Sequence, residues 1–232
     1  MALDPRPLAN APARGGGALR APVLAAALVL AGAPLAWGFD TAPEPYREAA
    51  LAGNVGVVAG RVYEERRQPT DAERGLVGTV VTLVPRSPKL LEELNTLRQG
   101  ARESVGTFRA SADALRRARE AHERALWEAG FPDLVVTMAV GASGAFAFEG
   151  VPVGDWILIA SRSVFVSKPS PREKAKLLGS YARGTRMIGY DAVTVWVREL
   201  RVTGGRGEPI ELTDRNVWFT GVVEERVLDA GR

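Results

Sequence analysis

The residue types that carry out most enzyme chemistry are scarce in this sequence. It contains one histidine and no cysteine among 232 residues. The residues after His122 are Glu123-Arg124-Ala125, so the His-Glu-x-x-His zinc pattern is absent. A Ser-His-Asp triad would have to use His122, which lies far in sequence from the expected strand turns. We therefore predict that the protein is not an enzyme and that it binds no metal and no cofactor.

Other motifs that could do chemistry also fail. Gly141-Ala142-Ser143-Gly144 resembles a nucleophile elbow, but residue 145 is Ala and a turn between β-strands is the wrong context. Gly204-Gly205-Arg206-Gly207 lacks the Gly-Lys-Ser/Thr of a phosphate loop and instead predicts a hairpin turn. The remaining pairs of acids lie in loops or at strand ends, where solvated surface is the default interpretation: Asp71/Glu73, Glu149/Asp155 and Glu224/Glu225.

Two groups of side chains remain as candidates for binding. The connection 167–189 carries six basic residues against one acid, and a loop of this length is typically functional or mobile. Trp196 and Trp218 lie on expected strands beside polar residues of their own faces, so each either packs in the core or stacks on a sugar or a partner side chain. The candidate partner-binding residues are Lys174, Lys176, Arg183, Arg186, Trp196 and Trp218.

The net charge argues against a nucleic-acid partner. The chain has a formal charge of +3, and residues 1–38 contribute +2 of it through three arginines and one aspartate. The remaining +1 gives no electrostatic footprint for DNA or RNA.

Residues 1–38 resemble a secretion signal. A lead that ends at Arg20 is followed by an uncharged, mostly apolar run over 21–37, and Ala36-Trp37-Gly38 offers small residues for cleavage. The run is shorter than the roughly 20 residues that a membrane span needs. We expect cleavage before Phe39 rather than an uncleaved anchor, no membrane span afterwards, and a periplasmic or secreted protein.

The stretch from Gly144 to Ala160 carries the clearest structural pattern. Phe146 and Phe148 alternate with alanines, which places both rings on one face of a strand. The segment 150–154, Gly-Val-Pro-Val-Gly, predicts a tight turn. Trp156-Ile-Leu-Ile-Ala160 then predicts a strand that is apolar on both faces. Together these residues predict a β-hairpin.

The same stretch resembles the carboxypeptidase regulatory-like domain. The family pattern is carried by Gly144, Phe146, Phe148, Val151, Pro152, Gly154, Trp156, Leu158 and Ala160. Residues 60–62 and 76–83 are similar to the two strands that precede it in the family. The resemblance implies a transthyretin-like β-sandwich that acts as an accessory domain, not as a catalytic unit.

A helical insertion interrupts this pattern. Ser87-Pro88 is typical of a helix start and Gly130-Phe131-Pro132 of a stop. Between them, residues spaced alternately by four and three predict an apolar seam: Leu90, Leu94, Leu97, Ala101, Ser104, Phe108, Ser111, Leu115, Ala118, His122 and Ala125. One unbroken helix would be about 60 Å long, so a turn near Gly100 or Gly106 is expected. The seam either packs on itself or the sandwich, or belongs to an arm that binds a partner.

The sequence therefore predicts a mainly β protein, a transthyretin-like or Ig-like antiparallel sandwich with an inserted long α-helix or helical hairpin. The expected parts are a signal peptide (1–38), a linker (39–54), the sandwich (55–84 and 134–225), the helical insertion (85–133) and a tail (226–232). The predicted function is binding or assembly in the cell envelope or outside the cell. The partner is a protein that contacts the insertion or the loop 167–189, and the alternative is carbohydrate that contacts the tryptophans.

Overall fold

A computed structural model describes residues 42–66, 68, 70, 72–167 and 185–228. Its helices are α1 (Glu44–Leu51), α2 (Pro88–Gly100), α3 (Val105–Glu128) and the short 3-10 helix η1 (Pro132–Leu134). Its strands are β1 (Val55–Glu64), β2 (Arg74–Gly75), β3 (Val80–Pro85), β4 (Val136–Ala139), β5 (Ala145–Pro152), β6 (Gly154–Ser167), β7 (Thr185–Val202), β8 (Gly205–Arg206), β9 (Ile210–Thr213) and β10 (Phe219–Leu228). The expected signal peptide lies outside the described residues.

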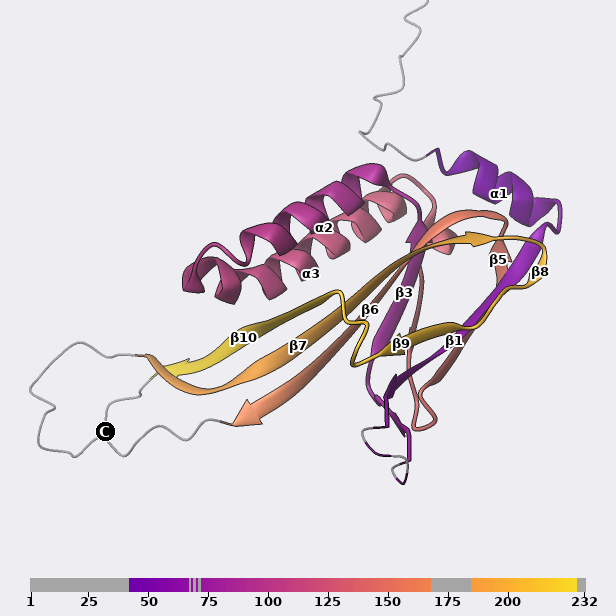
Figure 1. Ribbon diagram of the computed structural model, residues 1–232. Helices are drawn as coiled ribbons and strands as arrows, with labels where there is room; N and C mark the ends of the chain where they lie inside the picture. Colours follow the sequence, from indigo (N-terminus) through magenta and orange to yellow (C-terminus); the bar gives the residue numbers. More distant parts are fainter. Residues whose placement is uncertain (1–41, 67, 69, 71, 168–184, 229–232) are drawn as a thin grey trace, which may run out of the picture. The chain divides into compact units, whose positions relative to one another are not determined.

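The strands form two sheets, which confirms the predicted mainly β sandwich with an inserted helical hairpin (Figure 1). In sheet B the order is β10-β7-β6-β3-β4 and all neighbours are antiparallel. In sheet A, β1 pairs antiparallel with β2 and β5. The short strands β8 and β9 pair with β1 in parallel, so sheet A is mixed.

The predicted β-hairpin at the family-like stretch is wrong in one respect. β5 pairs with β1 in sheet A, whereas β6 pairs with β3 and β7 in sheet B. The chain therefore crosses from one sheet to the other at Val153. The glycines on either side have positive φ, 68° at Gly150 and 154° at Gly154, a region that disfavours other residues. The segment 204–207 makes a second crossing, from β7 to β8, and is not the hairpin turn expected there.

The core between the sheets matches the predicted alternation. Phe146 and Phe148 are both buried there, with ring centroids 6.1 Å apart. From β6, Trp156, Leu158 and Ala160 point into the same core. Burial of each phenylalanine or leucine side chain in this core stabilises the sandwich by roughly 1.5–3 kcal/mol.

A second core lies on the other side of sheet B, under the helices. Ile157 and Ile159 of β6 pack there with residues of α2 and α3, including Leu90, Leu94 and Leu115. The two helices form an antiparallel hairpin that covers this face of the sheet (Figure 1). The apolar seam thus packs on the sandwich, and the interpretation of the insertion as a projecting arm is wrong.

The ends of the two helices follow from local sequence. Ser87 accepts a hydrogen bond from the backbone N–H of Leu90 at 3.0 Å, and Pro88 is the first helical residue, as predicted. The chain turns at 101–104, close to the expected Gly100. Ser104 caps α3 through a reciprocal bond with Thr107, so its place in the predicted seam is wrong.

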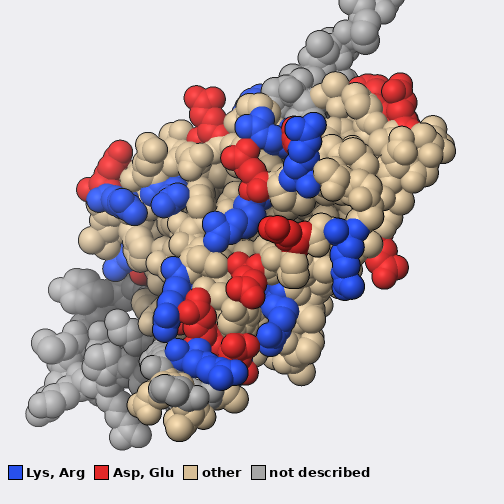
Figure 2. Space-filling view, turned by 45° about the vertical axis from the view of Figure 1, so that its right-hand side comes forward, with Lys and Arg blue, Asp and Glu red and all other residues tan. Residues whose placement is uncertain are grey.

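The expected linker 39–54 contains α1, which is attached to the sandwich. Tyr46 is buried against Trp156, and the guanidinium of Arg47 lies 4.1 Å from the centre of the Phe131 ring. Within the described ranges, no helix has the length and apolar character to cross a membrane. On the face seen in Figure 2, basic and acidic side chains are interspersed.

Candidate functional site

The basic loop that the sequence singled out is largely outside the described residues. Lys174, Lys176 and Arg183 all lie in the segment 168–184. Arg186 belongs to β7, but its side chain is outside the described part as well. The expected role of these residues stays a prediction.

Trp196 is a core residue and not a binding platform. Only 1% of it is exposed, and its Nε1 donates a hydrogen bond to the carbonyl of Thr213 at 2.8 Å. The polar neighbours on the same strand face, Thr194 and Arg198, are partly or fully exposed. A buried ring offers no face for a sugar to stack on.

Trp218 is half-buried and lies at the foot of a groove. It precedes β10, where its backbone N–H donates to the carbonyl of Val195 at 3.0 Å. The guanidinium of Arg98, from α2, lies 4.9 Å from the centre of its ring, a cation–π contact. We call the hollow here the outer groove, about 360 Å³ in volume and lined by Arg98, Ala101, Arg102, Phe108, Val217, Trp218, Phe219 and Thr220.

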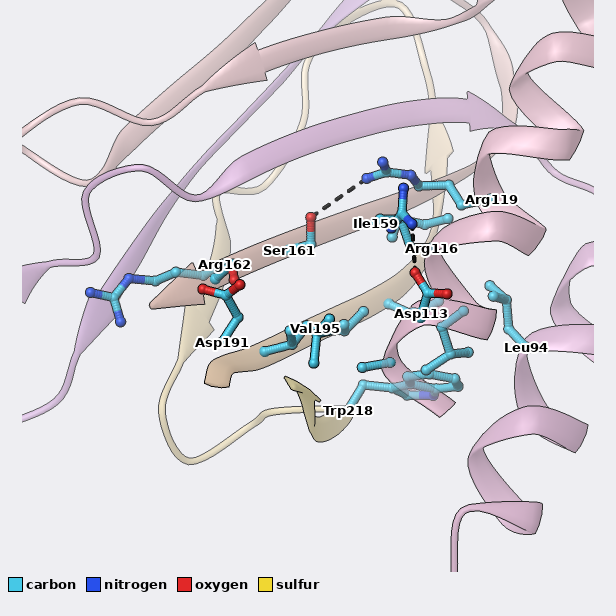
Figure 3. Close-up of a pocket in the computed structure, with 16 residues that line it drawn as sticks. Leu94, Asp113, Arg116, Arg119, Ile159, Ser161, Arg162, Asp191, Val195 and Trp218 are labelled. Atoms are coloured by element: carbon cyan, nitrogen blue, oxygen red, sulfur yellow. Dashed lines mark hydrogen bonds and ion pairs between the residues drawn. The ribbon is translucent and has the colours of Figure 1, made fainter. Parts of the chain in front are cut away.

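A second hollow, the inner cleft, lies between α3 and sheet B on the other side of Trp218 (Figure 3). Its volume is about 340 Å³. The apolar floor is made by Leu94, Ala112, Leu115, Ile159, Val193, Val195, Val197, Trp218 and Val223. Its polar rim is made by Asp113, Arg116, Arg119, Ser161, Arg162, Ser163 and Asp191.

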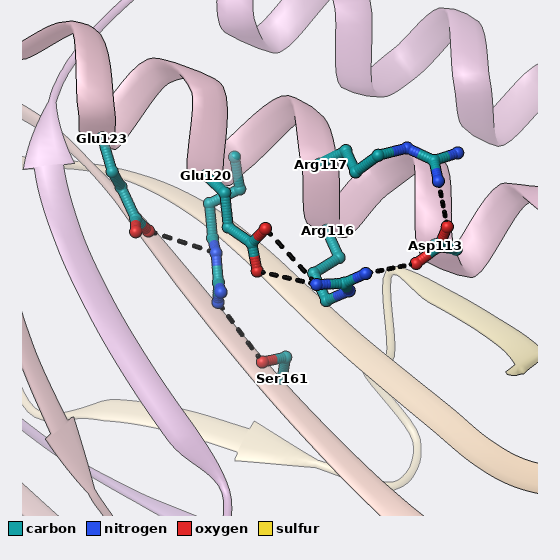
Figure 4. Close-up of polar contacts among 7 residues, drawn as sticks. Asp113, Arg116, Arg117, Glu120, Glu123 and Ser161 are labelled. Carbon is teal, nitrogen blue, oxygen red and sulfur yellow. Dashed lines mark hydrogen bonds and ion pairs between the residues drawn. The ribbon is translucent and has the colours of Figure 1, made fainter.

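Most charged groups on the α3 side of the rim form ion pairs along the helix (Figure 4). Asp113 pairs with Arg116 and Arg117, and the hydrogen bond from Arg116 lowers the pKa of the Asp113 carboxyl below its ordinary value. Arg116 also contacts Glu120 at 3.1 Å. These partners are spaced three or four residues apart, which places them on one helix face.

Arg119 and Glu123 form the most buried of the described rim pairs. The Arg119 Nε lies 3.1 Å from the Glu123 Oε1, but the two atoms are not aligned as a hydrogen bond. The Nη1 of Arg119 reaches the Ser161 Oγ of β6 at 3.5 Å. Burial raises the pKa of the Glu123 carboxyl, and the nearby Arg119 charge opposes part of that rise.

The sheet side of the rim is different. Arg162 follows Ser161 on β6, so its side chain lies on the opposite face of the sheet, where its Nε donates a hydrogen bond of 3.5 Å to the carbonyl of Val77. In the described part of the chain, the Asp191 carboxylate forms no ion pair and is an acceptor group at the mouth of the cleft.

Among the described residues, no histidine lines the outer groove or the inner cleft. Over the described residues, no group of three or more His, Cys, Asp or Glu side chains could hold a metal ion. His122 is half-buried on α3 and does not line either hollow. Both hollows are lined by apolar side chains, guanidinium groups and the indole ring of Trp218. Groups of these kinds make the contacts of ligand- and partner-binding sites.

The cleft floor was missed from the sequence. Residues 191, 193, 195 and 197 alternate along β7 and share the face that turns toward the helices, whereas Trp196 lies on the opposite face. The alternation is visible in the sequence, but it does not show which of the two faces turns toward the helices.

No family model matches the chain, and no curated protein matches it. The solved structures that resemble the chain at low identity include the following two. One is a protein of Pseudomonas aeruginosa provisionally described as carbohydrate-binding, 16% identical over 75% of this chain and 99% of that one, with a TM-score of 0.40. The other is the pilus backbone protein RrgB of Streptococcus pneumoniae, 14% identical over 63% of this chain and 33% of that one, with a TM-score of 0.22. Likenesses this distant carry no argument about the ligand.

Proposed function

We propose that the protein is a non-catalytic binding module of the periplasm or the extracellular space, and that it holds a protein partner at the outer groove. The observation that carries this proposal is the stacking of Arg98 on Trp218 beside a partly exposed Phe108. The resemblance to the carboxypeptidase regulatory-like domain supports an accessory role.

The groove has the composition of a protein-binding hot spot. Trp and Arg are enriched among the residues that dominate binding energy at protein interfaces. Phe108 is 37% exposed and Val105, at the start of α3, is 67% exposed, so the apolar surface extends beyond the groove. Arg98 and Arg102 give it positive charge, which suits an acidic segment of the partner.

Carbohydrate fits the groove less well. A sugar ring needs an open aromatic face, and Arg98 already lies over the ring of Trp218. Trp196, the other candidate platform, is buried. Binding of sugar here requires Arg98 to move away from the indole ring.

The test is a pull-down from the envelope fraction of the native host with Arg98→Glu and Trp218→Ala. Arg124→Glu is the matched control, because Arg124 is exposed on α3 and lines neither hollow. We expect both groove variants to lose a partner that the wild type and the control retain. Full retention by folded groove variants would overturn the proposal. Loss of polysaccharide binding by Trp218→Ala alone would favour carbohydrate instead.

The proposed compartment depends on residues 1–38 acting as a cleaved signal. Sequencing the N-terminus of the protein from its native host tests this, with a start near Phe39 as the expected result. An intact Met1 in a cytosolic fraction would contradict it.

A further inference from the structure

We propose that the inner cleft binds a single-chain amphiphile, an alkyl or acyl chain whose head group is not an anion. This site is separate from the outer groove, because it lies between α3 and the sheet and shares only Trp218 with the groove.

The cleft exists because α3 packs chiefly on the edge strand β10. At their closest approach, a Cβ built on Gly221 of β10 would lie 3.1 Å from the Cβ of Ala112. Close contact at this edge leaves α3 away from the middle of the sheet, where Val193 and Val197 of β7 remain only partly buried. The space over them is the cleft (Figure 3).

The floor selects an apolar body for the ligand. It is lined by aliphatic side chains from both layers, such as Leu115 of α3 and Ile159 and Val195 of the sheet. The hydroxyl groups of a sugar would lose water here without gaining hydrogen bonds, which is costly. A volume of about 340 Å³ lies at the small end of ligand pockets, which span roughly 300–1,000 Å³. One extended chain is therefore a better fit than a large fused-ring ligand.

The rim selects the head group. Counting the described rim residues that face the cleft together with their direct partners, three basic groups (Arg116, Arg117 and Arg119) stand against four acidic groups (Asp113, Glu120, Glu123 and Asp191). Among the described residues the mouth thus has a slight excess of negative charge and does not favour an anion. Asp191 can accept a hydrogen bond, and the exposed hydroxyl of Ser163 can donate or accept one. A head group that both accepts and donates hydrogen bonds, or that is zwitterionic, satisfies both.

The experiment measures binding to the full-length chain by isothermal titration calorimetry and native mass spectrometry, with each amphiphile below its critical micelle concentration. The probes are dodecyl maltoside, dodecylphosphocholine, dodecanoate and maltose. We expect one-to-one binding of either or both of the first two, binding of dodecanoate weaker by about tenfold or more, and no binding of maltose. Dodecyl maltoside and dodecylphosphocholine distinguish an uncharged head from a zwitterionic one.

Two variants locate the site. Val193→Phe fills the cleft floor and should weaken amphiphile binding by about tenfold or more. Asp191→Lys changes the charge balance of the described mouth residues from negative to positive, and should tighten dodecanoate binding by about tenfold. Because the second variant gains an affinity, misfolding cannot mimic its expected result.

Three results would overturn the proposal: no binding of any amphiphile by the wild type, equal binding by folded Val193→Phe, or dodecanoate bound as tightly as the neutral probes. Arg98→Glu separates this site from the outer groove. It should lose the protein partner and keep the amphiphile, whereas Val193→Phe should do the reverse.

Discussion

Tyr46 of α1 meets Trp156 of β6 edge to face, with ring centroids 5.1 Å apart and ring planes at 82°. The Tyr46 hydroxyl also donates a hydrogen bond of 2.5 Å to the backbone carbonyl of Asp155. These two contacts join a helix that precedes the first strand to the residue at the centre of the sandwich core. The helix is therefore an integral part of the domain.

The first prediction concerns this contact. Tyr46→Ala should lower the free energy of unfolding by about 3 kcal/mol, because it removes a buried aromatic ring and leaves a cavity over Trp156. Tyr46→Phe keeps the ring and should cost only about 1 kcal/mol for the lost hydrogen bond. Urea denaturation measures both, and an Ala variant as stable as the wild type would mean that α1 does not pack as described.

The second prediction concerns Gly154, where the chain enters sheet B. A Cβ at this residue would lie 2.6 Å from a ring carbon of Tyr46, and φ is +154°. Gly154→Ala should therefore destabilise the fold by roughly 1–3 kcal/mol. The cost should be smaller when Tyr46 is Ala, because the clash is then absent, and a double-mutant cycle measures that difference. Gly141→Ala is the control, since nothing lies within 4 Å of its Cβ.

A third prediction follows from the second core. Replacing 86–133 with a short Gly/Ser linker should expose Val84, Ile157, Ile159, Val195 and Phe219, which the helices cover. We expect aggregation or binding of a hydrophobic dye, because a contiguous apolar face becomes accessible to water. Size-exclusion chromatography and dye fluorescence measure this outcome. A monomeric deletion variant with a cooperative thermal transition would show that the hairpin is dispensable for the fold.

The fourth prediction concerns pH. Burial raises the folded-state pKa of Glu123, so between the ordinary glutamate pKa of about 4.3 and the raised value the folded state holds the extra proton. The contribution of this group to stability is therefore present at low pH and lost as the pH rises through that window. Glu123→Gln removes the titration. The stability of the wild type relative to this variant should fall from pH 4 upward and then level off, as measured by urea denaturation at each pH. A difference that rises with pH would show that the Arg119 charge outweighs burial.

The faces of individual strands could be predicted from the sequence, but their partners could not. The alternation of residues 156–160 correctly predicted a strand with apolar residues on both faces, with Trp156 and Ile157 on opposite sides, because side chains alternate with a period of two. The same alternation is compatible with a hairpin and with a crossing between sheets. The segment 150–154 is compatible with both arrangements. Whether the chain forms a hairpin or crosses between sheets at Val153 therefore depends on how its strands pair with distant parts of the chain.

The two hollows were harder to predict than the strands. The inner cleft is formed by α3 and β7, which are far apart in sequence, and its shape depends on how closely α3 approaches Gly221. The sequence left open whether Trp218 packs in the core or faces a partner, and the structure places it half-buried. Its contact with Arg98 depends on the position of α2, which a periodic pattern does not reveal.

The parallel pairing of β1 with β9 constrains the order in which the protein can be built. Gly60 lies beside Ile210, 150 positions later in the chain, and Tyr63 lies beside Thr213. Contacts between residues this far apart in sequence slow folding. A long loop must close, at a cost in chain entropy, before such contacts can stabilise the structure. While the chain is being synthesised, β1 therefore has one unpaired edge until β8 and β9 are available, and an unpaired edge is a template for association with other chains. Protection by a chaperone matters most during that interval, before residues 205–213 arrive.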